Sequence, residues 1–583
     1  MSERWRRWAT PFIAVLAVAA SLPGIVNKYT YDDRFIIELN GVVHSLRGWW
    51  RGFAHSYWPP IWGGDGYRPL TILAFKIQWV IGHGNPFVFH VVNIALYATV
   101  SVLVFLLAKR VLPLWAAWIT GALFAVHPVH VEAVANLVGQ SELLVATFLL
   151  VAMLLFLGDR QRGVLRGQTI AAIATLYAAA CFSKEHAIVL PALLLACELT
   201  VLRDDDSLVK RLLSQKSLYI SLGAIAVSFV VIRGAVLADH GFAGFQPFIP
   251  FSTLHITRRD RVLTAFGVVP QWLRLLYWPA HLSAEYGPPD IDVAQGFALW
   301  QIPGMLILAG IVGLGLFARR KQPVIALGIA MVCVALLPSS NFVLPAGIIL
   351  AERTLFLPSI GAMIIVGAVA VYGARVARRR YRVREFAVVT GVTCTLLLAA
   401  GIARSVVRDR NWRDNETLFR QSVVDAPRAY RAHFMLGSWA FENHRPSEGE
   451  REIRRALNLF PYDPFVALVV AERYRISGKC SAAMPMYQWI MGMEKDFPLG
   501  MAGYSICLLE TGQYAEAKAT ALRGLKVVGD TEDLRRVIVW ADSALAAAGA
   551  EQGRSPISLA GTPSKVPNSM QKTADTAGVR KDR

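Results

Sequence analysis

The sequence predicts an all-α protein with two parts, a polytopic bundle of transmembrane helices followed by an α-solenoid of helical repeats. Three observations support this class. Hydrophobic residues make up 55% of the 583-residue chain and charged residues only 17%, well below the roughly 25% charged residues of a soluble domain. Long apolar runs fill residues 9–405, with basic residues between them. Amphipathic helical periodicity replaces these runs from there on.

The first apolar run follows a basic N-terminus. Three arginines within residues 4–7 precede an uncharged stretch over residues 9–26, a pattern typical of a signal anchor. A cleavable signal is the alternative, because Ala17-Val18-Ala19 resembles a cleavage site. The apolar runs that follow favour the anchor. Both alternatives put the chain after Val26 outside the cytoplasm.

Further runs approach the roughly 20 residues that a membrane span requires. The candidate spans, the first included, are 9–26, 87–108, 113–130, 141–158, 167–182, 187–202, 217–236, 299–318, 323–338, 354–373 and 386–405. The run 262–279 contains Pro270 and Arg274. We therefore expect that run to form a re-entrant or interfacial helix.

Basic residues predict the orientation of the spans. With the N-terminus inside, Lys and Arg concentrate in the short inner connections, as the positive-inside rule requires. This pattern explains the net charge of +19 without nucleic acid. Other polar clusters then fall on the outer side, and ionisable groups at membrane depth usually face a cavity and serve a function. The expected cavity residues are Tyr67, Arg68, His127, His130, Glu132, Lys184, Glu185, Glu352 and Arg353.

The cysteines and histidines predict no metal site. None of the six cysteines forms a CxxC pair, and four lie in apolar runs. We expect small buried side chains there, and neither a disulfide framework nor a zinc site. A divalent metal ion bound by His127, His130 and Glu132 is the alternative to a pocket lining, but their spacing does not match a helical zinc signature. We expect these three side chains to line the pocket instead.

A 34-residue period follows the membrane part. Gly478 and Gly512 are one period apart, and Gly449, Ala483 and Ala517 have the same spacing. Small residues at these offsets allow the two helices of a tetratricopeptide unit to cross closely. The predicted repeats are 430–463, 464–497 and 498–531, with a capping helix over 534–548. The first unit has His444 where the other two have a turn glycine. The third unit has Gly529 where the first has its terminal Pro461. The turns therefore differ at these positions or the register slips.

The predicted domains are a membrane part over 1–408, a junction over 409–429, a repeat domain over 430–549 and a disordered tail over 550–583. Repeat stacks form extended concave surfaces. The repeats therefore either recruit an acceptor or act as a scaffold for self-association.

One group of residues suggests sugar transfer. Asp32 and Asp33 follow soon after the first span, and a carboxylate there can act as general base toward an acceptor hydroxyl. A turn or a helix cap is the alternative explanation for such a pair. A lipid-phosphate donor also needs cations, and arginine binds phosphate bidentately. Arg68, Lys184 and Arg353 are the candidates, each with an ion pair or an interfacial position as its structural alternative.

Several strings share their residues and order with a known family. They are Tyr31-Asp32-Asp33, Tyr67-Arg68-Pro69-Leu70-Thr71, residues 124–134 around His127-Pro128-Val129-His130, Ser183-Lys184-Glu185 and residues 351–359 around Glu352-Arg353. Asn411-Trp412 and residues 416–419 then precede the repeats. With these strings, about residues 25–530 resemble the transmembrane O-mannosyltransferases with tetratricopeptide repeats.

This resemblance implies a GT-C glycosyltransferase fold and a donor sugar, mannose or a similar hexose, carried by polyprenyl phosphate outside the cytoplasm. It also implies that the acidic motif Asp32-Asp33 is catalytic. We predict an inverting transfer with Asp33, in preference to Asp32, as the base. Arg353, with Lys184 or Arg68, then stabilises the departing lipid phosphate, and Glu142 joins the pocket. The chain departs from the family at Gln140, which replaces a basic residue. That departure leaves the donor sugar and the acceptor open.

We expect a multi-pass protein of a bacterial inner membrane, with the repeats on the non-cytoplasmic side binding a protein acceptor. The alternative is a non-catalytic membrane scaffold whose repeats bind envelope proteins. A transporter predicts an internal repeat among the spans, and the sequence contains none that we recognise.

Overall fold

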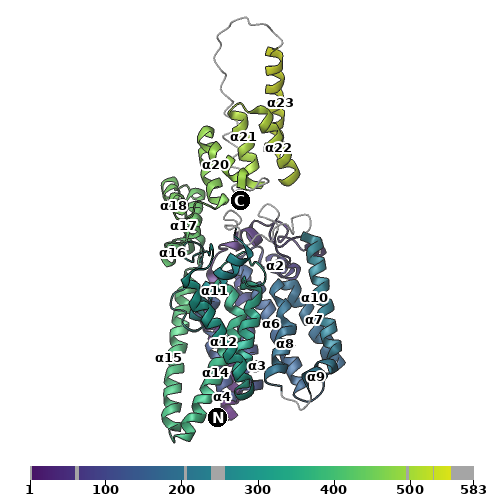
Figure 1. The fold of residues 1–583 in the computed structure, drawn as a ribbon, viewed down its shortest axis with the longest axis vertical. Coiled ribbons are helices and arrows are strands. Elements are labelled where there is room, and N and C mark those ends of the chain that lie inside the picture. The colour runs from purple at the N-terminus through teal and green to yellow at the C-terminus, as the bar shows by residue number, and fades with distance from the viewer. Residues whose placement is uncertain are drawn as a thin grey trace. The chain divides into compact units, whose positions relative to one another are not determined.

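The structure, a computed structural model, describes residues 3–59, 65–202, 207–237, 256–493, 498–528 and 531–552. Every regular element within these ranges is a helix (Figure 1), so the predicted all-α class is confirmed. The chain divides into two compact units, Met1–Trp439 and Ala440–Arg583. The division falls within α17 (Tyr430–Glu442), ten residues after the start of the predicted repeat domain.

The first unit is a bundle of apolar helices. Seven helices of the described part are long and apolar enough to cross a bilayer, or eight if one bent pair counts as a span. They are α1 (Glu3–Ser21) with its continuation to Val26, α3 (Pro86–Val111), α6 (Gln140–Arg160), α10 (Lys216–Leu237), α12 (Ile302–Lys321), α14 (Phe356–Arg379) and α15 (Val383–Arg410). The chain is therefore a multi-pass membrane protein.

The other four predicted spans form shorter or broken helices. They are α4 (Leu114–Ala125), which is bent by 46° against the residues that follow, α7 (Gly167–Ser183), α8 (Leu190–Thr200) and α13 (Pro323–Leu336). Polar or proline-containing strings interrupt them, His127-Pro128 after α4 and Lys184-Glu185 after α7. The strings that carry the family resemblance therefore lie at helix ends.

Two further helices belong to this unit. The apolar helix α2 (Pro69–Gly82) begins directly after Arg68, and its proline suits the first helical position. This helix was not among those expected from the sequence. The run 262–279 forms part of one helix, α11 (Arg258–Tyr277), with Pro270 inside it.

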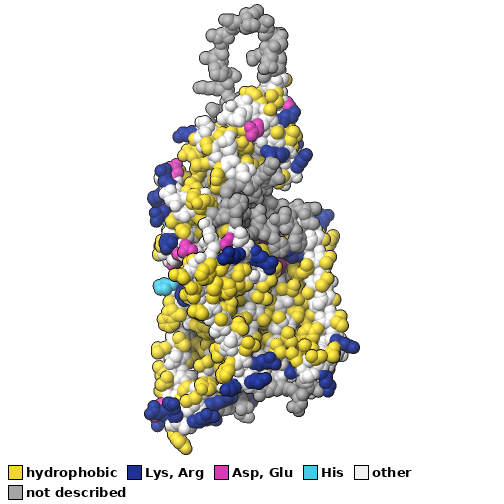
Figure 2. Space-filling model, viewed as in Figure 1, with side chains coloured by type: hydrophobic (Ala, Val, Ile, Leu, Met, Phe, Trp, Pro, Cys, Tyr) yellow, Lys and Arg dark blue, Asp and Glu magenta, His cyan; other side chains and the backbone are white. Residues whose placement is uncertain are grey.

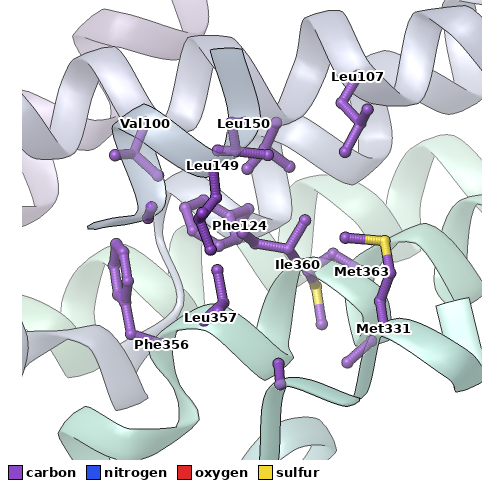
Figure 3. Packing of buried hydrophobic residues seen from close by; sticks show 14 of the residues in the cluster. Val100, Leu107, Phe124, Leu149, Leu150, Met331, Phe356, Leu357, Ile360 and Met363 are labelled. Carbon is purple, nitrogen blue, oxygen red and sulfur yellow. The ribbon is translucent and has the colours of Figure 1, made fainter. Parts of the chain in front are cut away.

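The core of the first unit lies where α3, α4, α6, α13 and α14 meet (Figure 3). Phe124 of α4 and Phe356 of α14 pack edge to face at its centre, with ring centroids 5.6 Å apart. Helices α13 and α14 come into close contact at Gly328 and Gly361. A Cβ atom on Gly361 would lie 2.5 Å from the carbonyl oxygen of Gly328, so neither position accepts a larger residue without moving a helix.

Charge is distributed unevenly over this unit. Hydrophobic side chains cover its middle, and Lys and Arg gather at the end where α9 (Leu208–Ser214) and the α14–α15 connection lie (Figures 1 and 2). The last turns of α3, α6, α12 and α14 all carry basic residues. An apolar band with basic residues at one end is the pattern expected of membrane helices.

The helices of the repeat region follow the predicted period. Three helix pairs begin at Tyr430, Pro464 and Pro498. They are α17 with α18 (Pro446–Leu459), α19 (Pro464–Ile476) with α20 (Cys480–Met493), and α21 (Pro498–Glu510) with α22 (Tyr514–Val528), followed by α23 (Glu532–Gln552). His444 adopts the left-handed backbone of the turn glycines, with φ 57° against 69° at Gly478 and 82° at Gly512. The predicted difference at His444 is therefore absent. Gly529 and the predicted tail beyond Gln552 lie outside the described residues.

A disulfide links Cys480 of α20 to Cys507 of α21, so the prediction of no disulfide was wrong. The two cysteines are 27 residues apart in sequence, and only the packing of α20 against α21 brings them together. The remaining cysteines have free thiols in apolar helices. Cys181, Cys197 and Cys394 are buried, as predicted, whereas Cys333 is partly exposed.

Candidate functional site

The two adjacent aspartates after α1 have different surroundings. Asp33 is fully buried, and its carboxylate accepts the backbone N–H of Val138 at 2.9 Å and that of Thr30 at 3.3 Å. Asp32 remains 18% exposed, and its Oδ2 lies 3.3 Å from Nη1 of Arg353. Asp33 therefore ties its loop to the turn before α6, whereas Asp32 faces the charged residues of other segments.

Burial acts on both carboxyl groups. It raises the pKa of Asp33 to about 8, although the backbone N–H groups of Val138, Leu137 and Thr30 lower that pKa. Burial also raises the pKa of Asp32 above its ordinary value. Positive charges oppose this rise, in decreasing order those of Arg353, Arg431, Arg68 and Lys184.

Arg353 stands in the short helix Glu352–Leu355 that leads into α14. Its backbone N–H donates to Glu132 Oε2 at 2.9 Å, and its Nη1 donates to Glu132 Oε1 at 3.1 Å. Glu132 is buried, so one carboxylate fixes both the backbone and the guanidinium of Arg353. The string at 127–132 thus orients the cation that contacts Asp32.

A second cationic group lies at the break between α7 and α8. Lys184 Nζ donates to Glu142 Oε1 at 2.5 Å, and His186 Nε2 lies 3.2 Å from Glu142 Oε2. Burial lowers the pKa of Lys184, although Glu142 raises it. Burial also lowers the pKa of His186 to about 4, so this imidazole is neutral at pH 7. Glu142 therefore carries the negative charge that holds Lys184.

Arg68 forms the third cationic group, at the start of α2. Its Nε donates to Glu185 Oε2 at 3.0 Å, and its guanidinium carbon lies 4.5 Å from the centre of the Tyr57 ring. Glu185 also accepts the backbone N–H of Tyr67 at 2.9 Å. Burial raises the pKa of Glu185, but Arg68 and this N–H outweigh it and lower the pKa to about 2. The Arg68–Glu185 pair therefore stays charged at every physiological pH.

These groups form one cluster around Asp32. The charges of Arg353, Arg68 and Lys184 all act on its carboxylate, and each cation has a side chain between 15% and 21% exposed. The structure therefore brings together the three cations and one of the two carboxylates that the sequence predicted.

Four predicted pocket residues lie in the packed interior instead. His127 Nε2 is 3.0 Å from the Leu276 carbonyl oxygen, and its Nδ1 accepts the N–H of Val129. Both ring nitrogens of His130 contact hydroxyl groups, those of Tyr97 and Ser359. The remaining two, Tyr67 and Glu352, are at most 1% exposed.

Both of those side chains have internal partners. The Tyr67 hydroxyl donates to the Phe53 carbonyl. Glu352 accepts from the Ser283 N–H and the Tyr286 hydroxyl, each at 2.6 Å. Across the residues that the structure describes, no three His, Cys, Asp or Glu side chains are grouped closely enough to hold a metal ion.

The residues that hold Tyr31, directly before Asp32, were not predicted from the sequence. The Tyr31 hydroxyl donates to Glu285 Oε1 at 2.5 Å, and the Tyr31 N–H donates to Asn415 Oδ1 at 2.8 Å. Glu285 Oε2 lies 3.5 Å from Nε of Arg431 in α17. Tyr31 and the junction before the repeats belong to the strings shared with the family, and this could have indicated that they lie at the site. Glu285 and Arg431 stand in no such string.

Comparisons with known proteins agree with the predicted resemblance. No family model matches the chain. Protein O-mannosyl-transferase TMTC4 of Mus musculus is 26% identical over 486 residues, which cover 74% of this chain and 63% of that protein. Protein O-mannosyl-transferase Tmtc1 of Drosophila melanogaster is 27% identical over 541 residues, covering 77% and 61%. Tmtc2 of the same fly is 34% identical over 295 residues, covering 47% and 30%.

A solved structure also aligns with the chain. The Archaeoglobus fulgidus oligosaccharyltransferase, tethered with an acceptor peptide, covers 79% of this chain and 60% of its own at a TM-score of 0.40 and 12% identity. A superposition this loose carries no conclusion about the site.

The fold and the site define a polytopic membrane protein with a cluster of paired cations and carboxylates next to the loop after its first helix. The chain is similar to the protein O-mannosyl-transferases over about three quarters of its length, which confirms the resemblance predicted from the strings. It spans less than two thirds of the length of these relatives.

Proposed function

We propose that the chain is a membrane glycosyltransferase that moves a hexose, mannose or a similar sugar, from a polyprenyl-phosphate carrier to a hydroxyl group of a protein or glycan. The observation that carries the proposal is the position of Asp32, a partly exposed carboxylate that lies 3.3 Å from Arg353 and whose pKa the charges of Arg68 and Lys184 also lower. The names of the relatives, all protein O-mannosyl-transferases, support it.

Asp32 acts as the general base in this proposal. It removes the proton of the acceptor hydroxyl, whose oxygen then forms a bond to the anomeric carbon of the sugar. The bond between that carbon and the phosphate oxygen breaks, and its electron pair leaves with the lipid phosphate. A single displacement of this kind inverts the anomeric configuration. The products are the glycosylated acceptor, the lipid phosphate and a protonated Asp32.

The assignment to Asp32 replaces the preference for Asp33 drawn from the sequence. The carboxylate of Asp33 is occupied by buried backbone N–H groups, so it has no free approach to an acceptor. These hydrogen bonds give Asp33 a structural role, in which it fixes the conformation of the loop after α1. Asp32 extends from that shaped loop toward the cations.

Arg353, Lys184 and Arg68 stabilise the charge that develops on the departing phosphate. Each already has a carboxylate partner, Glu132, Glu142 and Glu185 respectively. These partners hold the cations in place before the donor binds, so little reorganisation is needed during the reaction. Arginine at two of the three positions suits bidentate phosphate binding.

The reaction takes place on the non-cytoplasmic face of a bacterial inner membrane in this proposal. The basic helix ends support that orientation through the positive-inside rule. The repeats recruit the acceptor protein on the same side. The Cys480–Cys507 disulfide supports this location of the repeats, because disulfides persist in oxidising compartments such as the periplasm.

Intact-mass analysis of envelope proteins tests the function. Cells with the wild-type gene should contain proteins that carry a hexose-sized mass increment, and cells without the gene should lack it. The Asp32→Asn variant should fail to restore the increment, whereas Arg420→Gln, which removes a half-exposed pair with Glu416, should restore it. Full restoration by Asp32→Asn, together with loss on deletion of residues 430–531, would instead support the scaffold alternative.

A further inference from the structure

The residue before Asp32 has an unfavourable backbone conformation. Tyr31 has φ 56°, in the left-handed region that side chains with a Cβ rarely adopt. Three groups hold it there. Its N–H donates to Asn415, its hydroxyl donates to Glu285, and its ring packs edge to face against Trp412. Held left-handed residues of this kind often occur where a backbone must present a functional side chain.

The groups that hold Tyr31 come from outside its loop. Asn415 and Trp412 follow the last long helix, α15, and Glu285 belongs to the segment after α11. Glu285 is itself buried and lies next to Arg431 of α17. Its two carboxylate oxygens therefore connect a helix of the post-membrane segment to the residue before Asp32.

We propose that Glu285, together with Arg431, acts as a positioning residue for Asp32 by fixing Tyr31 in its left-handed conformation. This inference rests on the proposed function, in which Asp32 is the base. It makes the segment after the last long helix part of the catalytic centre, where the sequence had assigned it only to a junction and the repeats.

Loss of this support should affect catalysis more than donor binding. Without Glu285, only Asn415 and Trp412 still hold Tyr31. Tyr31 then relaxes more readily toward extended backbone, which turns Asp32 away from Arg353. The cations that bind phosphate keep their own partners, Glu132, Glu142 and Glu185. The KM for the donor should therefore stay the same while kcat falls, by about 100-fold for a displacement of about 1 Å.

Purified full-length protein in detergent tests the inference with polyprenyl-phosphate-mannose as donor and envelope proteins from cells lacking the gene as acceptors. Glu285→Ala and Tyr31→Phe should each lower kcat without changing the KM for the donor, and the double variant should be no worse than Glu285→Ala alone. Glu285→Gln, which still accepts the tyrosine hydroxyl, should recover most of the turnover. Arg420→Gln is the matched control, because it removes a half-exposed ion pair with Glu416 in the same segment and none of the three groups that hold Tyr31.

Hydrogen exchange of the peptide that spans residues 27–33 gives a readout that does not depend on activity. Exchange should rise in Glu285→Ala and Arg431→Ala and stay at the wild-type level in Arg420→Gln. Unchanged exchange, or a loss of folded protein with normal kcat per folded molecule, overturns the inference. If wild-type protein transfers no mannose while exchange rises as expected, the proposed function fails and the ordering of the loop by Glu285 still holds.

Discussion

Asp32 and Arg353 stand 321 residues apart in the sequence, and a distance of 3.3 Å separates Oδ2 of the first from Nη1 of the second. The contact joins the loop after α1 to the start of α14. Glu132 holds Arg353 from the other side, so the guanidinium has a fixed position between two carboxylates. A phosphate that approaches Asp32 therefore meets a cation that is already oriented.

The two adjacent aspartates should respond differently to the same substitution. Asp32→Asn should lower kcat by about 100- to 10,000-fold, the usual contribution of a general base, and should leave the melting temperature close to that of the wild type. The measurement is sugar transfer from polyprenyl-phosphate-mannose, normalised to folded protein.

Asp33→Ala should act on stability instead. It leaves buried N–H groups of Thr30 and Val138 without an acceptor, and each such group costs about 1–3 kcal/mol. A large drop in the melting temperature is the expected result. Full turnover in Asp32→Asn together with none in well-folded Asp33→Asn would return the base assignment to Asp33.

The pH dependence of turnover should identify the base a second time. A general base works only when deprotonated, so the rate falls as pH drops through its pKa. Burial raises the pKa of Asp32 above its usual value, so the acidic limb of kcat/KM should lie above about pH 4.

Arg353→Gln should move this limb to higher pH. Four positive charges lower the pKa of Asp32. Arg353 has the largest effect, followed by Arg431, Arg68 and Lys184. Arg431→Gln should shift the limb in the same direction. A limb that stays in place in both variants would mean that another group controls the rate.

The sequence predicted much of the fold because spans and repeats have simple periods. Apolar runs mark the long helices, and a 34-residue period marks the starts of the helix pairs at Tyr430, Pro464 and Pro498. The span count was less accurate, because length and apolarity do not show where a helix breaks. The breaks occur at the polar strings, such as His127-Pro128, that had been expected to line a pocket.

The candidate site was predictable where charge stands at helix ends. Arg68, Lys184 and Arg353 were candidates because cations are conspicuous among apolar residues. The sequence could not show that both ring nitrogens of His127 and of His130 have partners inside the protein, because a buried histidine and an exposed one look the same in a sequence. Glu285 and Arg431 gave no local signal, since only tertiary packing brings them to Tyr31.

A buried ion pair next to the site should be essential for stability. Arg408 is 1% exposed, and its guanidinium lies between Asp425, at 2.9 Å, and the fully buried Glu352, at 3.7 Å. Arg408→Ala leaves the Glu352 carboxylate without a positive partner, which should lower the free energy of unfolding by about 3–5 kcal/mol. Thermal unfolding in detergent measures the change.

Arg420→Ala provides the comparison for this prediction. It removes a half-exposed pair with Glu416, for which the expected loss is below about 1 kcal/mol. Similar melting temperatures for the two variants would show that the network of Arg408 contributes no more than an exposed pair.

The Cys480–Cys507 disulfide should stabilise the repeat region, and it should form only if that region lies outside the cytoplasm. The bond closes a loop between residues 27 positions apart, so its reduction should lower the stability of the repeat region by about 3 kcal/mol. Dithiothreitol should therefore lower the melting temperature of the wild type. It should not change that of a Cys480→Ser/Cys507→Ser variant, which starts at the lower value.

Thiol labelling of protein denatured directly from cells, in detergent that exposes every free thiol, tests the same bond as it exists in the cell. Alkylation without reduction, followed by reduction and a second reagent, should place the second mass tag on Cys480 and Cys507 alone. Cys333 and Cys394, which are free, should receive only the first tag once the membrane is solubilised. If Cys480 and Cys507 also take the first tag, they are reduced in the cell, and the argument from the disulfide for a non-cytoplasmic repeat region is lost, because disulfides are rare in the reducing cytoplasm.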